Sequence, residues 1–93
     1  MEFTIFYHPD VRDVDLPLLD NKIKARIRRA IEERLRTQPQ NYGTPLRKTL
    51  KGYWKLRVGD YRIVFKISGH EVLVLAICHR RNVYPKIEKR KLQ

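Results

Sequence analysis

A chain of 93 residues, 42 % hydrophobic and 33 % charged, is long enough for one globular domain and leaves no room for a second. Large aliphatic and aromatic residues are spread through most of it, which excludes a disordered protein. Lys and Arg outnumber Asp and Glu by 21 to 10, so we expect a polyanionic partner, with nucleic acid ahead of an acidic protein or an anionic membrane.

The single cysteine and the N-terminal sequence indicate where the protein works. Cys78 has no second cysteine with which to form an internal disulfide. The start of the chain has neither a basic n-region nor a long apolar run, and no stretch approaches the ~20 apolar residues of a membrane helix. We therefore expect a soluble, cytoplasmic protein with no membrane partner.

The first half of the chain predicts one strand and two helices. Residues 2–7 are β-branched and aromatic and predict a strand. Asp10 is expected to cap a short helical segment through about Leu16. A longer helix capped by Asp20 is predicted, and residues 37–45 after it read as a loop. The apolar stripe of the longer helix consists of Ile23, Ile27, Ala30, Ile31 and Leu35. Its charged faces are most simply solvated, with contact to RNA or a protein as the alternative.

Residues 53–67 predict a β-hairpin that turns at Gly59 and Asp60. Because side chains alternate along a strand, one face is apolar and the other is cationic. The apolar face carries Trp54, Leu56, Val58, Tyr61, Ile63, Phe65 and Ile67. The cationic face carries Tyr53, Lys55, Arg57, Arg62, Val64 and Lys66. Arg57 and Arg62 stand directly opposite each other and repel, so this face is explained either by a bound anion or by solvated surface charge.

Residues 71–78 are apolar on both faces, which predicts a strand in the middle of a covered sheet. Directly after this strand, where functional loops commonly sit, come His79, Arg80, Arg81 and Tyr84. Residues 86–93 predict a basic tail that is either a frayed helix or disordered.

The order of the elements predicts an α+β fold in a single domain spanning residues 1–93. Two N-terminal helices are expected to pack on one face of a mostly antiparallel sheet of about four strands. They would cover the face of Trp54 and Phe65 and leave the face of Lys55 and Arg57 open.

The chain has no phosphate loop, no zinc-ligand spacing and no Gly-x-Ser-x-Gly elbow, so we expect neither a metal nor a cofactor. What remains is positive charge among aromatic side chains. Around the hairpin, these residues are Arg47, Lys48, Lys51, Tyr53, Lys55, Arg57, Arg62 and Lys66. After the last strand, they are His79, Arg80, Arg81 and Tyr84. Cations neutralise phosphates and Tyr stacks on unpaired bases, so the combination predicts binding of single-stranded RNA.

Two stretches resemble the RelE branch of the RelE/ParE toxin superfamily. They read Leu-Lys-Gly-Tyr-Trp-Lys-Leu-Arg-Val-Gly-Asp-Tyr-Arg-Ile-Val-Phe at residues 50–65 and Ile-Cys-His-Arg-Arg-Asn-Val-Tyr at residues 77–84. The opening strand, residues 36–39 and residues 43–46 also fit, so the resemblance spans nearly the whole chain. It implies a RelE-like fold and a toxin of a type II toxin-antitoxin pair that is held inactive by its antitoxin and cuts messenger RNA in the ribosomal A site.

The resemblance also implies a site, residue by residue. The positions that match the family's functional residues are Lys55, Arg57, Arg62, Arg81 (or Arg80) and Tyr84. One position departs from the family pattern, because Tyr53 stands where RelE-like toxins have a second lysine. In the His-Arg-Arg variant of this site, His79 is then a candidate for the missing acid or base function.

Metal-free RNA cleavage must deprotonate a 2′-hydroxyl, stabilise the charge on phosphorus and protonate the leaving 5′-oxygen. Positive neighbours favour a neutral amine, which makes Lys55 the candidate base. Arg62 would hold the phosphate oxygens, since a planar fork suits them. Arg81 or His79 would supply the proton to the leaving oxygen, directly or through water, and Tyr84 would stack on or orient the base.

Two other functions are compatible with the sequence. One is a ParE-like toxin that inhibits DNA gyrase by binding, and the other is a basic nucleic-acid- or protein-binding module without catalysis. In the toxin hypothesis, the partners are messenger RNA on the ribosome and a cognate antitoxin. We expect that antitoxin to be acidic and partly disordered, to wrap residues 23–35 and to approach Arg62 and Arg81.

Overall fold

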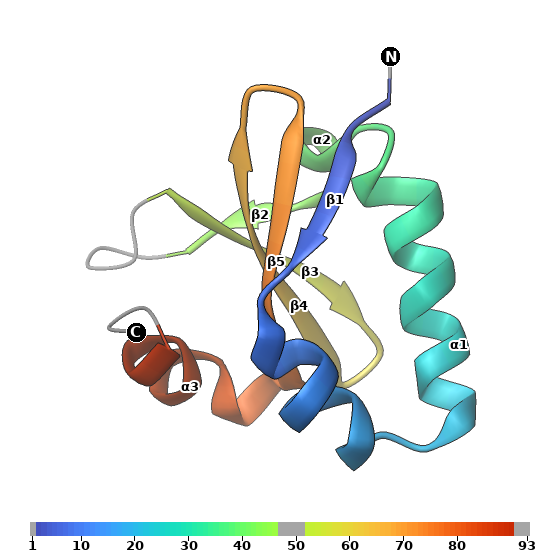
Figure 1. Cartoon of the computed structure of the whole chain (residues 1–93), viewed down its shortest axis with the longest axis vertical. Helices are drawn as coiled ribbons and strands as arrows, with labels where there is room; N and C mark the ends of the chain where they lie inside the picture. The colour runs from blue at the N-terminus through green and yellow to red at the C-terminus, as the bar shows by residue number, and fades with distance from the viewer. Residues whose placement is uncertain (1, 47–51, 91–93) are drawn as a thin grey trace.

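The computed structural model describes residues 2–46 and 52–90 and has one five-stranded mixed sheet (Figure 1). Across the sheet the strand order is β1-β5-β4-β3-β2. The strands are β1 (Thr4–Tyr7), β2 (Thr44–Pro45), β3 (Tyr53–Val58), β4 (Tyr61–Ser68) and β5 (Glu71–His79). The predicted α+β class is confirmed. The extra strand, β2, and the short helix α2 (Pro39–Tyr42) both lie in the stretch that we predicted as a loop.

The β3–β4 hairpin has the predicted register. Arg57 is opposite Arg62, and Lys55 is opposite Val64. Gly59 has a φ of 60°, a left-handed conformation that suits glycine because it has no Cβ. The alternation of apolar and charged residues therefore predicted correctly which hairpin side chains share a face.

The first strand pairs in parallel with the last one. Thr4 is opposite Glu71 and Tyr7 is opposite Val74, so β1 forms one edge of the sheet and β5 is enclosed between β1 and β4. Val72, Val74 and Ala76 of β5 have no exposed surface, as predicted for a strand with both of its faces covered.

The first helical layer consists of the short helical segments η1 (Val11–Asp15) and η2 (Leu16–Leu18), followed by α1 (Asn21–Ala30) and η3 (Ile31–Leu35). The Asp20 cap is confirmed, because its Oδ1 accepts the backbone N–H of Ile23 at 2.9 Å. The Asp10 cap is wrong, since its side chain makes no capping bond. The apolar stripe of α1 and η3 packs against the predicted apolar face of the hairpin, which forms the main core.

A second layer lies on the opposite face of the sheet and was not predicted. The helical turn η5 (Arg80–Asn82) leads into α3 (Val83–Arg90), which lies across the sheet from α1 (Figure 1). Val83 and Ile87 of α3 pack with Val64, Ala76 and Cys78. The second face is therefore partly covered instead of open. Residues 86–90, predicted as part of a basic tail that is either a frayed helix or disordered, belong to this helix, and residues 91–93 lie outside the described ranges.

A buried ionic cluster holds α3 in place. Asp15 accepts hydrogen bonds from Arg90 at 2.8 and 3.1 Å, from Lys86 Nζ at 3.0 Å and from the backbone N–H of Ile77 at 2.8 Å. Burial by itself would raise the pKa of Asp15, but these hydrogen bonds outweigh it and lower the pKa. Arg90 also donates to the carbonyl of Leu75 at 3.0 Å, so η1, β5 and α3 are joined at one point.

No helix in the described part of the chain is long and apolar enough to cross a bilayer.

Candidate nucleic-acid interface

Three of the predicted site residues lie together on the second face of the sheet. Lys55 and Arg57 are two residues apart on β3, and Arg62 of β4 is the direct partner of Arg57. Lys55 and Arg62 are half-buried, whereas Arg57 is exposed. The strands therefore hold three cations side by side on this face.

The guanidinium of Arg62 is fixed at the hairpin turn. Its Nη1 donates to the carbonyl of Gly59 at 3.1 Å and to that of Tyr61 at 2.9 Å. Both bonds use Nη1. Within residues 2–46 and 52–90, the Nη2 and Nε atoms of Arg62 carry no hydrogen bond. A preoriented fork with free donors is suited to phosphate oxygens.

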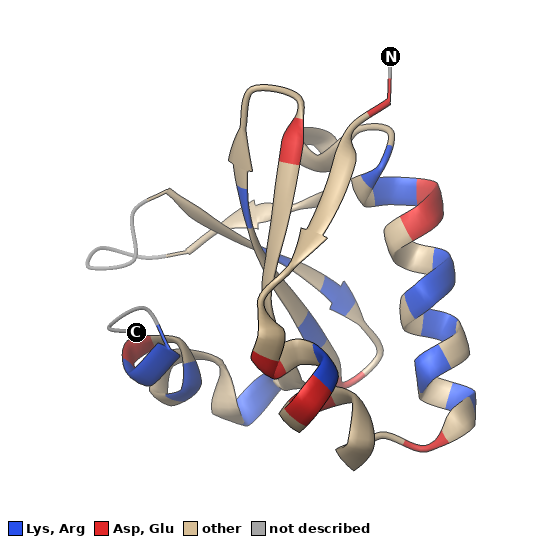
Figure 2. Ribbon diagram, in the orientation of Figure 1, with Lys and Arg blue, Asp and Glu red and all other residues tan. Residues whose placement is uncertain are grey.

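The segment after β5 lies beside the same turn. The backbone N–H of Arg80 donates to the carbonyl of Asp60 at 2.8 Å, which ties η5 to the tip of the hairpin. Arg80 and Arg81 are exposed, and Tyr84 in the first turn of α3 is 37 % exposed. Figure 2 shows Lys and Arg positions on β3 and β4 and at the junction of β5 with α3. The segment that carries Arg80 and Arg81 thus lies beside the tip of the hairpin, although the two are far apart in the sequence.

The structure does not bring His79 to this surface. Strand alternation places Cys78 on the second face, in the cluster with Val83, and His79 on the first face. The His79 ring is edge-on to the Tyr61 ring at 5.8 Å between centroids. Its Nδ1 accepts the backbone N–H of Arg81 at 3.3 Å. His79 therefore caps η5 and orients the arginines that follow it.

The predicted RNA-binding residues fall into three groups. Tyr53 packs against the second core cluster, and Lys66 Nζ lies 5.6 Å from the centroid of its ring, so that ring is not an open stacking platform. Arg80 lies at the surface described above. The remaining predicted cations, Arg47, Lys48 and Lys51, lie outside the described residues.

Cys78 and the acidic residues offer no alternative chemistry in the described part of the chain. Burial raises the pKa of Cys78 to about 11, so its thiol stays neutral and is a poor nucleophile. No three His, Cys, Asp or Glu side chains among the described residues are placed to hold a metal ion.

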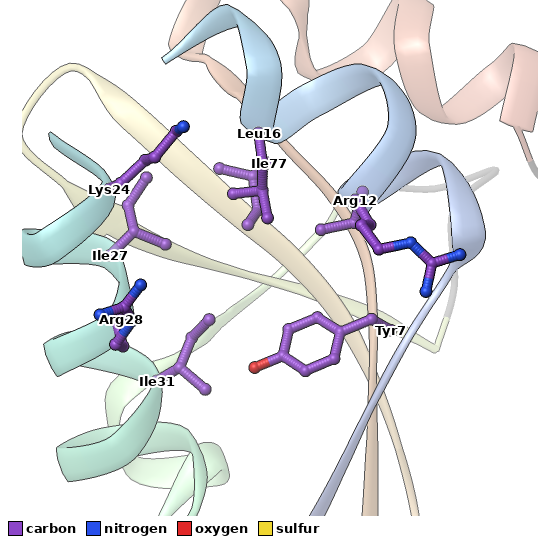
Figure 3. A pocket seen from close by; sticks show the side chains of 9 residues that line it. Tyr7, Arg12, Leu16, Lys24, Ile27, Arg28, Ile31 and Ile77 are labelled. Carbon is purple, nitrogen blue, oxygen red and sulfur yellow. The ribbon is translucent and has the colours of Figure 1, made fainter. Parts of the chain in front are cut away.

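A groove that the sequence analysis missed lies between α1 and the segment that follows β1 (Figure 3). Its volume is about 320 Å³. The floor is apolar and includes Ile27, Ile31 and Ile77, and the cationic rim is formed by Arg12, Lys24 and Arg28. Burial, followed by the negative charge of Glu32, raises the pKa of Tyr7, whose hydroxyl stays a hydrogen-bond donor here. An apolar floor with a basic rim is suited to a partner that is both apolar and acidic. No sequence signal pointed to this groove, because its lining comes from six elements, β1, η1, η2, α1, η3 and β5.

The sheet and its two helical layers are those of a class of small toxins. A family model described as the ParE toxin of the type II toxin-antitoxin system parDE matches residues 4–84. Toxin RelE3 of Methanocaldococcus jannaschii is 33 % identical over 76 residues, which cover 75 % of this chain and 83 % of the relative. Toxin RelG of Mycobacterium tuberculosis is 30 % identical over 86 residues, which cover 90 % and 98 %.

Solved structures agree with these relatives. The toxin-antitoxin complex RelBE2 of Mycobacterium tuberculosis contains a chain that superposes with a TM-score of 0.79 at 29 % identity, covering 86 % of this chain and 100 % of that one. A double arginine mutant of E. coli RelE in the free state superposes at 0.75 with 12 % identity, covering 99 % and 96 %, which supports the fold alone. The chain belongs to the RelE/ParE superfamily, as a RelE-like toxin of a type II toxin-antitoxin system.

Proposed function

We propose that this toxin is a metal-independent endoribonuclease that cleaves messenger RNA in the ribosomal A site. One observation supports it above the others: Lys55, Arg57 and Arg62 share one sheet face, and a hydrogen bond ties the Arg80–Arg81 segment to the turn that fixes Arg62. Cleavage proceeds by attack of a 2′-hydroxyl on the adjacent phosphate.

In the proposed reaction, each step falls to one of the predicted site residues. Lys55 takes the proton of the 2′-hydroxyl as general base. The free donors of Arg62 bind the phosphate oxygens and stabilise the negative charge that builds up there. Because His79 faces the other side of the sheet, Arg81 is left to orient a water that protonates the 5′-oxygen. Tyr84, which is partly exposed in the first turn of α3, stacks on the base.

The alternative within the superfamily is a ParE-like gyrase inhibitor, which acts by binding and needs no catalytic group. The joint presence of Lys55, Arg62, Arg81 and Tyr84 favours the nuclease, because a binding function gives no reason for this combination. A basic binding module without catalysis is the third possibility, and the same experiment separates all three.

The test is induced expression followed by mapping of messenger RNA 5′ ends. We expect new ends within reading frames that disappear in the Lys55→Ala/Arg62→Ala variant. A matched control, Lys22→Ala/Arg28→Ala, removes the same charges from α1 and should leave the cuts in place. Growth arrest with intact messages and damaged DNA would exclude the nuclease, whereas no effect on messages, DNA or growth would leave a binding module.

The proposed inhibitor is an acidic antitoxin that wraps residues 23–35. One solved relative is named as a toxin-antitoxin complex. The groove along α1 provides an apolar floor and a cationic rim for such a chain (Figure 3). In the purified complex, hydrogen exchange should slow along residues 23–35 and the Arg62 and Arg81 side chains should be covered. A complex that leaves both arginines exposed would contradict inhibition by direct occlusion.

A further inference from the structure

A hollow lined by arginines lies between the first helical layer and the tip of the β3–β4 hairpin, apart from the groove described above. Its volume is about 300 Å³. We call it the arginine hollow, after its four cations Arg26, Arg29, Arg34 and Arg57. Ala30, Glu33, Val58 and Gly59 complete the lining.

Local geometry explains why these side chains converge. Arg26 and Arg29 are three residues apart, so they lie on one side of α1, and Arg34 follows on η3. Arg57 comes from a part of β3 that β2 does not reach, because β2 pairs only with Trp54 and Lys55. At the turn, a Cβ on Gly59 would lie 3.1 Å from Nη1 of Arg26, so this guanidinium rests over the glycine.

The charges of the hollow are not balanced by the described part of the protein. Within the described ranges, the side chains of Arg26, Arg29 and Arg57 make no hydrogen bond or ion pair, and the guanidinium of Arg34 lies 5.7 Å from the centroid of the Tyr42 ring. Other arginines do find a carboxylate: Arg36 binds Glu32 at 2.8 Å and Arg90 binds Asp15 at 2.8 Å. Four guanidinium groups line the hollow against one carboxylate, Glu33, so they repel one another, which an external anion would relieve.

We propose that the arginine hollow binds a backbone phosphate of RNA, as a second contact beside the candidate nuclease face. Its lining is mainly polar, unlike the apolar floor of the groove in Figure 3, so it fits a phosphate better than an apolar side chain. Arg57 connects the two sites, because it stands opposite Arg62 and about 7 Å along the strand from Lys55. The inference rests on the proposed function only in taking RNA as the ligand, and it requires no catalysis.

The test measures how the affinity for RNA depends on salt. The probe is a mixed-sequence 2′-O-methyl RNA of about 20 nucleotides, which cannot be cleaved because it has no free 2′-hydroxyl. Binding to the wild type and to Arg26→Gln/Arg29→Gln is followed by fluorescence anisotropy from about 50 to 400 mM NaCl. Each phosphate that the variant no longer neutralises should reduce the slope of log K against log salt by about 0.7, and affinity near 100 mM should fall on the order of tenfold. Both arginines are exposed, so the fold should survive, and circular dichroism checks this.

The control is Lys22→Gln/Lys89→Gln, which removes two exposed charges that line neither the arginine hollow nor the groove of Figure 3. It should keep the wild-type slope. Equal slopes in the two double variants would overturn the phosphate site. A wild-type slope for Arg26→Gln/Arg29→Gln together with a weakened affinity for a glutamate-rich peptide would also overturn it and assign the hollow to an acidic protein. Messages that stay intact when the wild type is expressed would refute the nuclease and leave the slope result standing.

Discussion

The carboxylate of Asp15 is buried and satisfied by donors from β5 and α3. Asp15→Asn would remove a charge on which the buried Arg90 and the largely buried Lys86 depend. Because an unpaired buried charge is costly, we expect the free energy of unfolding to fall by about 3–5 kcal/mol. Urea denaturation measures the free energy of unfolding of the wild type and the variant. The control is Asp13→Asn, at an exposed carboxylate on the same segment, which should change the free energy of unfolding by less than about 1 kcal/mol.

The same carboxylate predicts how stability depends on pH. The pKa of Asp15 is lower in the folded protein than its ordinary value of 3.8, so folding favours the ionised form. Its contribution is complete above the unfolded value and is lost as pH falls from there toward the folded pKa. Urea midpoints measured at a series of pH values should therefore show a larger acid-induced loss in the wild type than in Asp15→Asn. Parallel curves would contradict this assignment.

At the scale of elements, α3 is a structural part of the second face. Ile87 has no exposed surface and packs in the cluster with Val64 and Cys78. Ile87→Ala would leave a cavity and should cost about 2–5 kcal/mol in unfolding free energy, with faster hydrogen exchange concentrated in α3. Leu73→Ala is the control, because Leu73 is 36 % exposed on β5, and it should cost clearly less. Equal losses in the two variants would mean that α3 does not depend on this contact.

Elements whose information is local could be predicted from the sequence. The hairpin register followed from strand alternation around Gly59 and Asp60, and the α1 cap followed from Asp20 three residues before Ile23. The position of His79 on the first face was also available, since it follows Cys78 by one residue, but its neighbours Arg80 and Arg81 suggested a site residue.

Elements that depend on distant contacts could not be predicted. The parallel pairing of β1 with β5 joins residues that are far apart in the chain, such as Thr4 and Glu71. The helix α3 is fixed by bonds from Arg90 to Asp15, which is 75 residues away. Residues 86–90 are basic, and from the sequence alone they are indistinguishable from a solvated tail. Only the structure shows that Lys86 and Arg90 bind the buried carboxylate of Asp15. For the same reason, the arginine hollow was seen in the sequence only as a charged helix face.

At the scale of the whole molecule, charge opposes stability. The net charge is +11, and the Cα radius of gyration is 12.1 Å. At about 10 mM salt the screening length is about 30 Å, so each cation senses charges throughout the molecule, whereas at about 100 mM it falls to about 10 Å. The compact state should therefore be destabilised by self-repulsion at low salt and recover as salt is added.

This repulsion predicts that salt raises the melting temperature and that the arginine hollow contributes to the effect. Between about 10 and 100 mM NaCl, we expect Tm to rise by about 4 °C, the shift that corresponds to about 1 kcal/mol in a domain of this size. Calorimetry at constant pH measures it. Arg26→Gln/Arg29→Gln removes two cations that have no carboxylate partner among the described residues, so its Tm should be higher than wild type at low salt and rise less with added salt. A Tm that is flat or falls with salt would show that self-repulsion is not limiting. A variant that gains stability while losing RNA affinity would indicate that these arginines are kept unpaired for binding at a cost to the fold.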